Sequence, residues 1–167
     1  MKKALLIGIN DYPCGNELHG CVEDVKSLHS VLERNGDGTK NFDIKDLLDV
    51  QTSGEAMHAI EELFRGDEEI ALLYFSGHGF VNSTGGELVL PDGYNSGSYY
   101  TGLQMSSIMN IVNRSKIKNK IIILDCCHAG NIAENIESAN SELREGVSIL
   151  TACRKDEFAM EMGGHGV

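Results

Sequence analysis

Residues 69–79, Glu-Ile-Ala-Leu-Leu-Tyr-Phe-Ser-Gly-His-Gly, are the stretch that most clearly indicates the fold. The run from Glu69 to Phe75 is apolar on both faces, as in a strand buried in a parallel sheet. It leads to His78, which lies between two glycines. A second apolar run, Lys120 to Leu124, leads into Asp-Cys-Cys-His-Ala-Gly at 125–130. If the two strands are neighbours, a thiol and an imidazole emerge at one sheet edge, which suits a nucleophile and a general base.

Strands and helices alternate along the rest of the chain. Helical spacing of apolar residues predicts helices, and short apolar runs predict strands. The expected strands are Lys3–Ile9, Ile44–Val50, Glu69–Phe75, Lys120–Leu124 and Gly146–Ala152, with a hairpin strand at Glu87–Leu90; the expected helices are Gly20–Asn35, Thr52 or Ser53 to Arg65, and Leu103–Arg114. This order predicts an α/β fold with a mainly parallel sheet covered on both faces. Sites in such folds form beyond the carboxyl ends of the strands.

Composition excludes several function classes. The chain has 167 residues, 41% of them hydrophobic and 23% charged, so one domain with its own core is expected. Its net charge of −11 disfavours nucleic acid as a partner, because phosphates attract cations, and is compatible with a basic substrate. The longest apolar runs are too short to span a membrane or to serve as a signal peptide. We therefore expect a cytoplasmic protein.

The five cysteines do not form a disulfide or zinc pattern. Their number is odd, their spacing is irregular, and no C-x-x-C pair occurs, so reduced thiols are expected. Cys126 and Cys127 alone are compatible with two small core residues at the end of a strand. His78 alone is compatible with a structural histidine. Together, two glycine-framed reactive residues at two strand ends favour chemistry over packing.

Five segments carry a resemblance to a known family. They are A-L-L-I-G-I-N-D-Y (4–12), L-H-G-C-V-E-D-V (18–25), Y-F-S-G-H-G (74–79), I-L-D-C-C-H-A-G (123–130) and L-T-A-C-R-K-D-E-F-A-M-E (150–161). The chain resembles the caspase-like fold of the clan CD cysteine peptidases, and within it the metacaspase, paracaspase and bacterial caspase-homologue branch. The histidine of caspases precedes the cysteine by about 50 residues, and here positions 78 and 127 fit that separation. The fold implied is a three-layer α/β/α sandwich.

The resemblance implies a role for several residues. Cys127 is the nucleophile and His78 is the general base and acid, while the backbone N–H groups of Gly79 and Cys127 form the oxyanion hole. Asp24, Asp125 and Glu157 line a pocket for an Arg or Lys side chain, because converging carboxylates favour a cation. Asp156 competes with Glu157 if the loop register shifts by one residue. Asp24 and Glu157 are also compatible with ordinary solvent-exposed charges.

The expected partner is a protein or peptide with Arg or Lys before the scissile bond. No cofactor is expected. Residues 80–104 hold only Glu87 and Asp92 as acids, so calcium activation, common among metacaspases, has little support. We expect one caspase-like domain over residues 1–167, with a large-subunit region to about residue 145 and the start of a small-subunit region at 146–167. The loop-like ending at 163–167, directly after a strand, favours a processed or truncated C-terminus, with a remaining small-subunit segment.

Two other interpretations compete with a peptidase. A non-catalytic caspase-like module would serve interaction alone, but such a module tends to lose one of the two reactive residues, and both are present. A redox or nucleotide-binding enzyme on a doubly wound sheet would need a C-x-x-C pair or a glycine-rich phosphate loop, and neither occurs.

Overall fold

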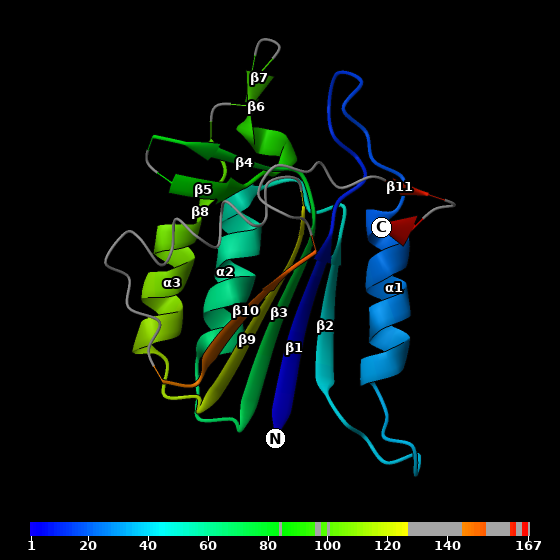
Figure 1. The fold of residues 1–167 in the computed structure, drawn as a ribbon, viewed down its shortest axis with the longest axis vertical. Coiled ribbons are helices and arrows are strands. Elements are labelled where there is room, and N and C mark those ends of the chain that lie inside the picture. Colours follow the sequence, from blue (N-terminus) through cyan, green and yellow to red (C-terminus); the bar gives the residue numbers. More distant parts are fainter. Residues whose placement is uncertain are drawn as a thin grey trace.

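A computed structural model describes residues 1–83, 85–95, 98–99, 101–126, 145–152, 161–162 and 165–166. Its centre is a five-stranded sheet in the order β10-β9-β3-β1-β2, and all neighbouring strands in it are parallel. Figure 1 shows the sheet between α1 on one side and α2 and α3 on the other. The sheet strands are β1 (Lys2–Gly8), β2 (Asp43–Leu48), β3 (Ile70–Gly77), β9 (Asn119–Cys126) and β10 (Val147–Thr151). This arrangement confirms the predicted α/β class.

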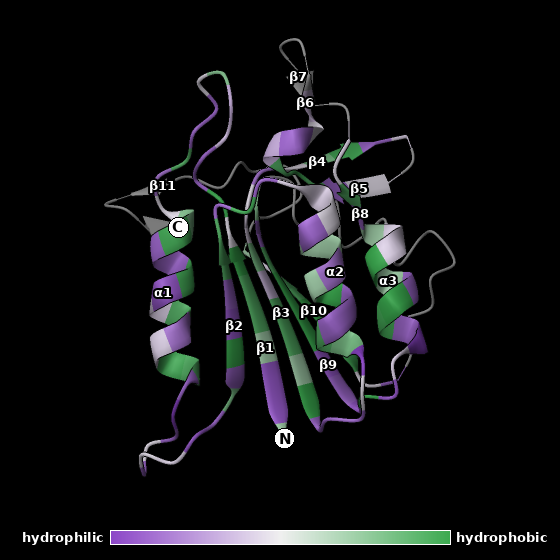
Figure 2. Cartoon of the chain, turned by 180° about the vertical axis from the view of Figure 1, so that it is seen from behind, coloured by the Kyte–Doolittle hydropathy of each residue, from purple (hydrophilic) through white to green (hydrophobic). Residues whose placement is uncertain are grey.

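Each face of the sheet packs against its own helices. Helices α2 (Ser53–Phe64) and α3 (Met105–Arg114) cover the larger core, which includes Phe75, Leu124 and Cys126. Helix α1 (Cys21–Leu32) covers the smaller core, which includes Leu72 and Tyr74. Because side chains alternate along a strand, neighbouring residues of β3 serve different cores. Figure 2 shows the hydrophobic colouring along the inner strands and the polar stripes on α2 and α3.

A second, smaller sheet lies beyond the carboxyl end of β3. Strands β4 (Gly79–Asn82), β5 (Gly85–Leu88) and β8 (Leu103–Gln104) form it, with antiparallel pairing. Two shorter hairpins are formed by β6 (Tyr94–Asn95) with β7 (Ser98–Tyr99), and by β11 (Glu161–Met162) with β12 (His165–Gly166). A short 3-10 turn, Pro91–Gly93, follows β5. The sequence had predicted only one hairpin strand here, at Glu87–Leu90, and that prediction is wrong by two residues.

The predicted helices and central strands are all present, with shifted ends. The helix predicted over Gly20–Asn35 ends at Leu32, and the one predicted from Leu103 begins at Met105. Thr52 is the N-cap of α2, as expected, and its hydroxyl accepts a hydrogen bond from Glu55 N at 3.3 Å. The strands β3 and β9 continue two residues past their apolar runs, to Gly77 and Cys126. The polar residues that follow each apolar run are therefore part of the sheet, because they are paired with the neighbouring strand.

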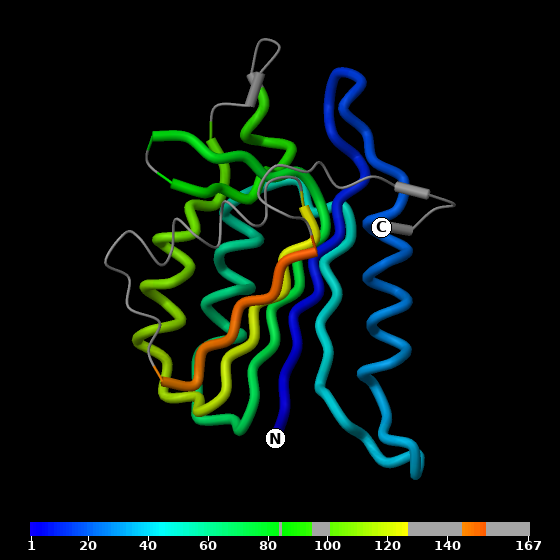
Figure 3. The backbone as a smooth tube through the Cα atoms, viewed as in Figure 1, coloured from blue at the N-terminus to red at the C-terminus, as the bar shows by residue number. Residues whose placement is uncertain are grey.

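The carboxyl ends of the strands meet at one edge of the sheet. Figure 3 shows β1, β3, β9 and β10 running side by side from the end near the N-terminus to the opposite end. Along this edge, Gly8 is paired with Ser76, and Gly77 is paired with Cys126. Within the described part of the chain, no helix combines the length and the apolar character that a membrane-spanning segment needs.

Candidate active site

His78 is the single residue between β3 and β4. Its carbonyl oxygen accepts a hydrogen bond from Val89 N at 2.9 Å, which continues the β4–β5 pairing backwards by one residue. The backbone on both sides of His78 therefore belongs to a sheet. This position holds the imidazole at the edge of the central sheet, where the sequence predicted it.

The hydroxyl of Tyr12 takes the place of one backbone hydrogen bond in that pairing. In a regular antiparallel pair, His78 N would donate to Val89 O. Instead, His78 N donates to Tyr12 Oη at 3.0 Å, and Tyr12 Oη donates to Val89 O at 3.0 Å. Tyr12 is only 1% exposed, so both bonds are shielded from water. A side chain from a loop 66 residues away thus fixes the backbone of His78.

The imidazole of His78 has two further contacts. Its Nε2 lies 2.8 Å from the carbonyl oxygen of Asn16, and its ring lies 4.5 Å from the ring of Tyr12, centroid to centroid. A carbonyl oxygen only accepts hydrogen bonds, so Nε2 carries the proton in this contact. In the neutral ring, Nδ1 is then the nitrogen with the basic lone pair. The contact therefore fixes which of the two ring nitrogens can accept a proton.

The loop that carries Tyr12 and Asn16 is anchored at both ends. Asp49 Oδ1 accepts hydrogen bonds from Asn10 N at 2.7 Å and from Asp11 N at 2.9 Å. Leu18 N donates to Asn10 O at 2.9 Å, which closes the loop on itself. The contacts to His78 therefore come from an ordered segment.

Gly79 is the first residue of β4, opposite Leu88. Hydrogen-bonded and non-hydrogen-bonded pairs alternate along an antiparallel ladder. Because the Val89–His78 bond marks the preceding pair as hydrogen-bonded, the Gly79–Leu88 pair is of the other kind. The N–H of Gly79 is therefore directed away from β5.

The predicted nucleophile, Cys127, lies outside the described residues. The residue before it, Cys126, ends β9, is 1% exposed and is paired with Gly77, the residue before His78. The structure thus brings the ends of the two motif-bearing strands to adjacent positions. The second oxyanion donor, Cys127 N, also lies outside the described part.

Two of the predicted pocket acids are associated with Tyr74. Asp125 is opposite Ser76 in the sheet, and Tyr74 Oη donates a hydrogen bond to Asp125 Oδ2 at 3.2 Å. Asp24 lies in the first turn of α1, and its charge also acts on the Tyr74 hydroxyl. Burial above all, and then the charges of Asp125 and Asp24, raise the pKa of Tyr74 well above its usual range. Glu157 and its competitor Asp156 lie outside the described residues.

The position of Asp24 follows from close packing between α1 and β1. A Cβ atom added to Gly8 would lie 2.5 Å from the carbonyl oxygen of Cys21, so only glycine permits this approach. Cys21 begins α1, and Asp24 follows one turn later on the same helix. The sequence placed Asp24 on this helix, but it did not reveal that Tyr74 is hydrogen-bonded to Asp125.

The sequence also missed Tyr12 and Asn16. Tyr12 belongs to the motif at residues 4–12, but the sequence predicts no role for it, although a buried tyrosine generally needs a partner for its hydroxyl. Asn16 acts through its backbone carbonyl, which leaves no signal in the side-chain pattern.

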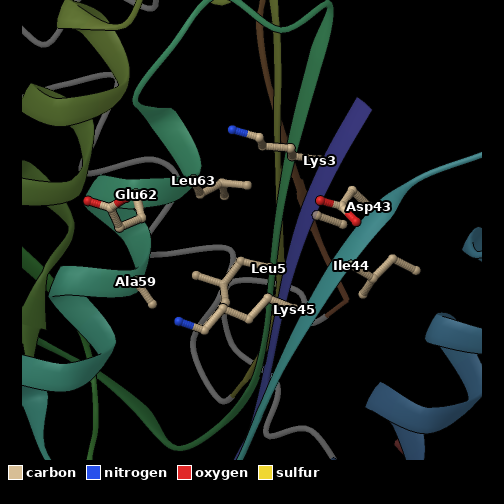
Figure 4. Close-up of a pocket in the computed structure, with 9 residues that line it drawn as sticks. Lys3, Leu5, Asp43, Ile44, Lys45, Ala59, Glu62 and Leu63 are labelled. Atoms are coloured by element: carbon tan, nitrogen blue, oxygen red, sulfur yellow. The ribbon is translucent and has the colours of Figure 1, made fainter. Parts of the chain in front are cut away.

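A hollow of about 220 Å³ lies at the opposite end of the sheet. Figure 4 shows Lys3 and Lys45 from the strands and Glu62 from α2 at its rim. Lys3 and Lys45 belong to the amino-terminal halves of β1 and β2, whereas His78 and Asp125 are at carboxyl ends of strands. Among the residues that the structure describes, no group of three or more His, Cys, Asp or Glu side chains is placed to hold a metal ion.

The fold and the site together define a class of protein. A parallel α/β sheet that presents a glycine-framed histidine beside a cysteine-bearing strand has the arrangement expected of a cysteine peptidase domain, in which a nucleophile and a base come within reach of each other. The caspase domain family, a peptidase family, matches residues 1–166, and the chain belongs to this family. This match confirms the resemblance and the caspase-like fold.

The relatives support the same family. Metacaspase-6 of Arabidopsis thaliana is 28% identical over 176 residues, covering 93% of this chain and 43% of that protein. Metacaspase-1B of Aspergillus fumigatus is 29% identical over 145 residues, covering 77% of this chain and 35% of that protein. The chain thus spans less than half the length of these curated relatives. The crystal structure of protein GSU0716 from Geobacter sulfurreducens has a TM-score of 0.70 over 99% of this chain and 78% of that chain; at 16% identity it shows a shared fold alone.

Proposed function

We propose that the chain is a cysteine endopeptidase that cleaves after arginine or lysine, with Cys127 as the nucleophile and His78 as the general base. One observation carries the proposal: the register that pairs Gly77 with Cys126, the residues directly before His78 and Cys127. The caspase domain match supports the peptidase chemistry.

The chemistry follows in two steps. The sulfur of Cys127 attacks the carbonyl carbon of the scissile bond while His78 accepts the thiol proton, and His78 then protonates the leaving amine as the C–N bond breaks. The resulting thioester is hydrolysed by a water whose proton His78 accepts, and Cys127 is regenerated. The bond between His78 Nε2 and the Asn16 carbonyl supports this role, because it leaves Nδ1 as the basic nitrogen.

The negative charge that develops on the carbonyl oxygen of the substrate is stabilised by hydrogen-bond donors. The N–H of Gly79, which is directed away from β5, and the N–H of Cys127 are the proposed pair. One such donor typically lowers the barrier by about 3–4 kcal/mol.

The proposed preference for a basic substrate side chain rests on the acidic residues of the pocket. Asp125 accepts a hydrogen bond from the buried Tyr74, and the charge of Asp24 also disfavours ionisation of that hydroxyl. Glu157 is the proposed third acid. Carboxylates in such a site favour a guanidinium or ammonium group and disfavour an acidic one.

Fluorogenic peptides test the proposal. Peptides ending in arginine, lysine, aspartate or leucine are compared with the full chain and with Cys127→Ala. We expect cleavage of the arginine and lysine peptides only, and none by the variant. Cleavage by Cys127→Ala would overturn the nucleophile, and preference for aspartate would overturn the pocket. No cleavage of any peptide would favour a non-catalytic interaction module.

We also propose that no metal ion takes part. The two acids of residues 80–104 have structural partners: Glu87 accepts from Asn82 Nδ2 at 2.8 Å and from Gly102 N at 2.7 Å, and Asp92 accepts from Ser53 N at 2.7 Å. Activity on the arginine peptide should therefore be equal in a calcium chelator and in added calcium. A requirement for calcium would contradict the proposal.

A further inference from the structure

Tyr74 lies at the centre of a polar cluster on the α1 face of the sheet. It is 6% exposed and belongs to the smaller core, with Leu72 and Ile123. Ser76, two residues later on β3, points to the same face, and Asp125 is the partner of Ser76 on β9. Tyr74, Ser76 and Asp125 therefore share one face at the carboxyl edge of two adjacent strands.

The hydrogen bond between Tyr74 and Asp125 has a defined direction. The hydroxyl of Tyr74 donates to Asp125 Oδ2 at 3.2 Å, because an ionised carboxylate only accepts. Ser76 lies on the same face of β3, and the charge of Asp24 in α1 also disfavours ionisation of this hydroxyl. The Tyr74 hydroxyl thus joins β3 to β9 through the carboxylate of Asp125.

We infer that Tyr74 is a specificity-determining residue, whose hydroxyl holds the carboxylate of Asp125 in the orientation that binds the basic side chain of the substrate. The inference rests on the proposed function. A hydrogen bond to a carboxylate favours its charged form and fixes its plane. With one oxygen held by Tyr74, the carboxylate is held in a fixed plane. A cation gains most from such a preorganised partner.

The burial of Tyr74 keeps its hydroxyl able to donate this hydrogen bond. The phenol stays neutral and protonated, since burial and two nearby carboxylates disfavour the phenolate. Tyr74 therefore supplies a donor without adding a third negative charge. A phenylalanine would keep the ring but would leave Asp125 without this donor.

The test compares binding of charged and uncharged side chains by the full chain and by Tyr74→Phe. Peptide aldehydes ending in arginine or in citrulline, its uncharged analogue, are measured as reversible inhibitors, beside KM and kcat for the arginine peptide. For Tyr74→Phe we expect Ki and KM for arginine to rise about tenfold or more, because bonds to charged groups are the stronger ones. The citrulline Ki and kcat should change less than about twofold.

A matched control and a double variant sharpen the test. Glu23→Gln changes a carboxylate of α1 that is paired with Lys26 at the surface, and it should leave the arginine Ki unchanged. Asp125→Asn alone and together with Tyr74→Phe should have the same Ki, because Tyr74 acts through Asp125. Additive losses would overturn the inference.

The other outcomes separate the two proposals. If the unmodified chain does not cleave the arginine peptide, the proposed function fails, and this inference fails with it. If it does cleave, but Tyr74→Phe keeps the arginine-to-citrulline ratio or loses kcat alone, only the inference fails. Should Tyr74→Phe not fold, Tyr74→His, which keeps a ring donor, is compared with Tyr74→Met, which has none. Equal preference for arginine in these two variants would overturn the inference.

Discussion

Two buried tyrosines serve the two halves of the site from opposite faces of the sheet. Tyr12 belongs to the core under α2 and α3, and its hydroxyl joins two backbone groups, His78 N and Val89 O. Tyr74 belongs to the core under α1, and its hydroxyl donates to a carboxylate, Asp125. Tyr12 therefore fixes the position of the proposed base, His78. Tyr74 instead favours the charged form of a carboxylate in the proposed pocket, that of Asp125.

The difference comes from the partners. Neutral backbone groups need only direction and distance, so the loss of Tyr12 should disturb where His78 lies. A carboxylate also needs its charge to be favoured, so the loss of Tyr74 should disturb what Asp125 attracts. The kinetic consequences should separate into kcat for the first tyrosine and KM for the second.

Removing the imidazole should have the largest effect. His78→Ala takes away the group that accepts the thiol proton, and we expect kcat on the arginine peptide to fall by about 10⁴-fold. The backbone bonds to Tyr12 and Val89 do not use the imidazole, so the free energy of unfolding should fall only by the loss of the Asn16 hydrogen bond and the Tyr12 ring contact, about 1–3 kcal/mol. Steady-state kinetics and thermal unfolding of the same sample check both. A loss of less than about tenfold would mean that another group is the base.

Crowding Tyr12 should have the next largest effect. A Cβ atom at position 77 would lie 2.5 Å from Tyr12 Oη, so Gly77→Ala must displace the tyrosine and with it His78. We expect kcat to fall by about 100-fold, the cost of a misplacement of about 1 Å. Gly54→Ala is the matched control, because a Cβ there meets no atom within 4 Å, and it should leave kcat unchanged. Equal kinetics in both variants would show that Tyr12 does not position His78.

Tyr12→Phe tests the hydroxyl itself. The variant keeps the ring beside His78 but removes the bridge between His78 N and Val89 O. We expect kcat to fall about tenfold with KM unchanged, and the free energy of unfolding to fall by about 1–3 kcal/mol. Tyr74→Phe should show the opposite split. If both variants changed KM alone, the contrast between the two tyrosines would be wrong.

The smallest effect concerns stability in alkali. Burial, and then the charge of Asp125, raise the pKa of Tyr74 in the folded chain, whereas an unfolded tyrosine titrates at about 10. The folded state then holds its proton longer than the unfolded state. The stabilising contribution is therefore complete below about pH 10 and declines above it, by up to about 1.4 kcal/mol per pH unit. Urea unfolding across this range should show a shallower decline for Tyr74→Phe, and equal slopes would contradict the shift.

Local patterns were sufficient to predict the layers of the fold. Apolar runs identified the inner strands, and Thr52 marked the start of α2. The same patterns ended β3 at Phe75 and β9 at Leu124, because Ser76 and Asp125 are polar. Those two residues are paired with each other in the sheet, and that pairing, unlike hydropathy, is a tertiary property.

The site was predictable only in part for a similar reason. Glycines around His78 and the acid at Asp125 are visible in the sequence. Tyr12 contacts His78 across 66 residues, and Tyr74 contacts Asp125 across 51 residues. Local spacing in the sequence therefore cannot predict either contact. The Asn16 contact uses a backbone oxygen, which every residue has. The catalytic roles of His78 and Cys127, and the pocket roles of Asp24, Asp125 and Glu157, all stay predictions.

Covalent labelling tests the peptidase proposal most directly. The full chain is treated with a peptidyl acyloxymethyl ketone ending in arginine, and the modified cysteine is located by mass spectrometry among the five in the sequence. We expect one label, on Cys127, that is lost in His78→Ala and is not formed by the reagent ending in aspartate. Labelling of the exposed Cys14 or of another cysteine instead, or equal labelling of Cys127 by both reagents, would contradict the proposed nucleophile or the proposed pocket.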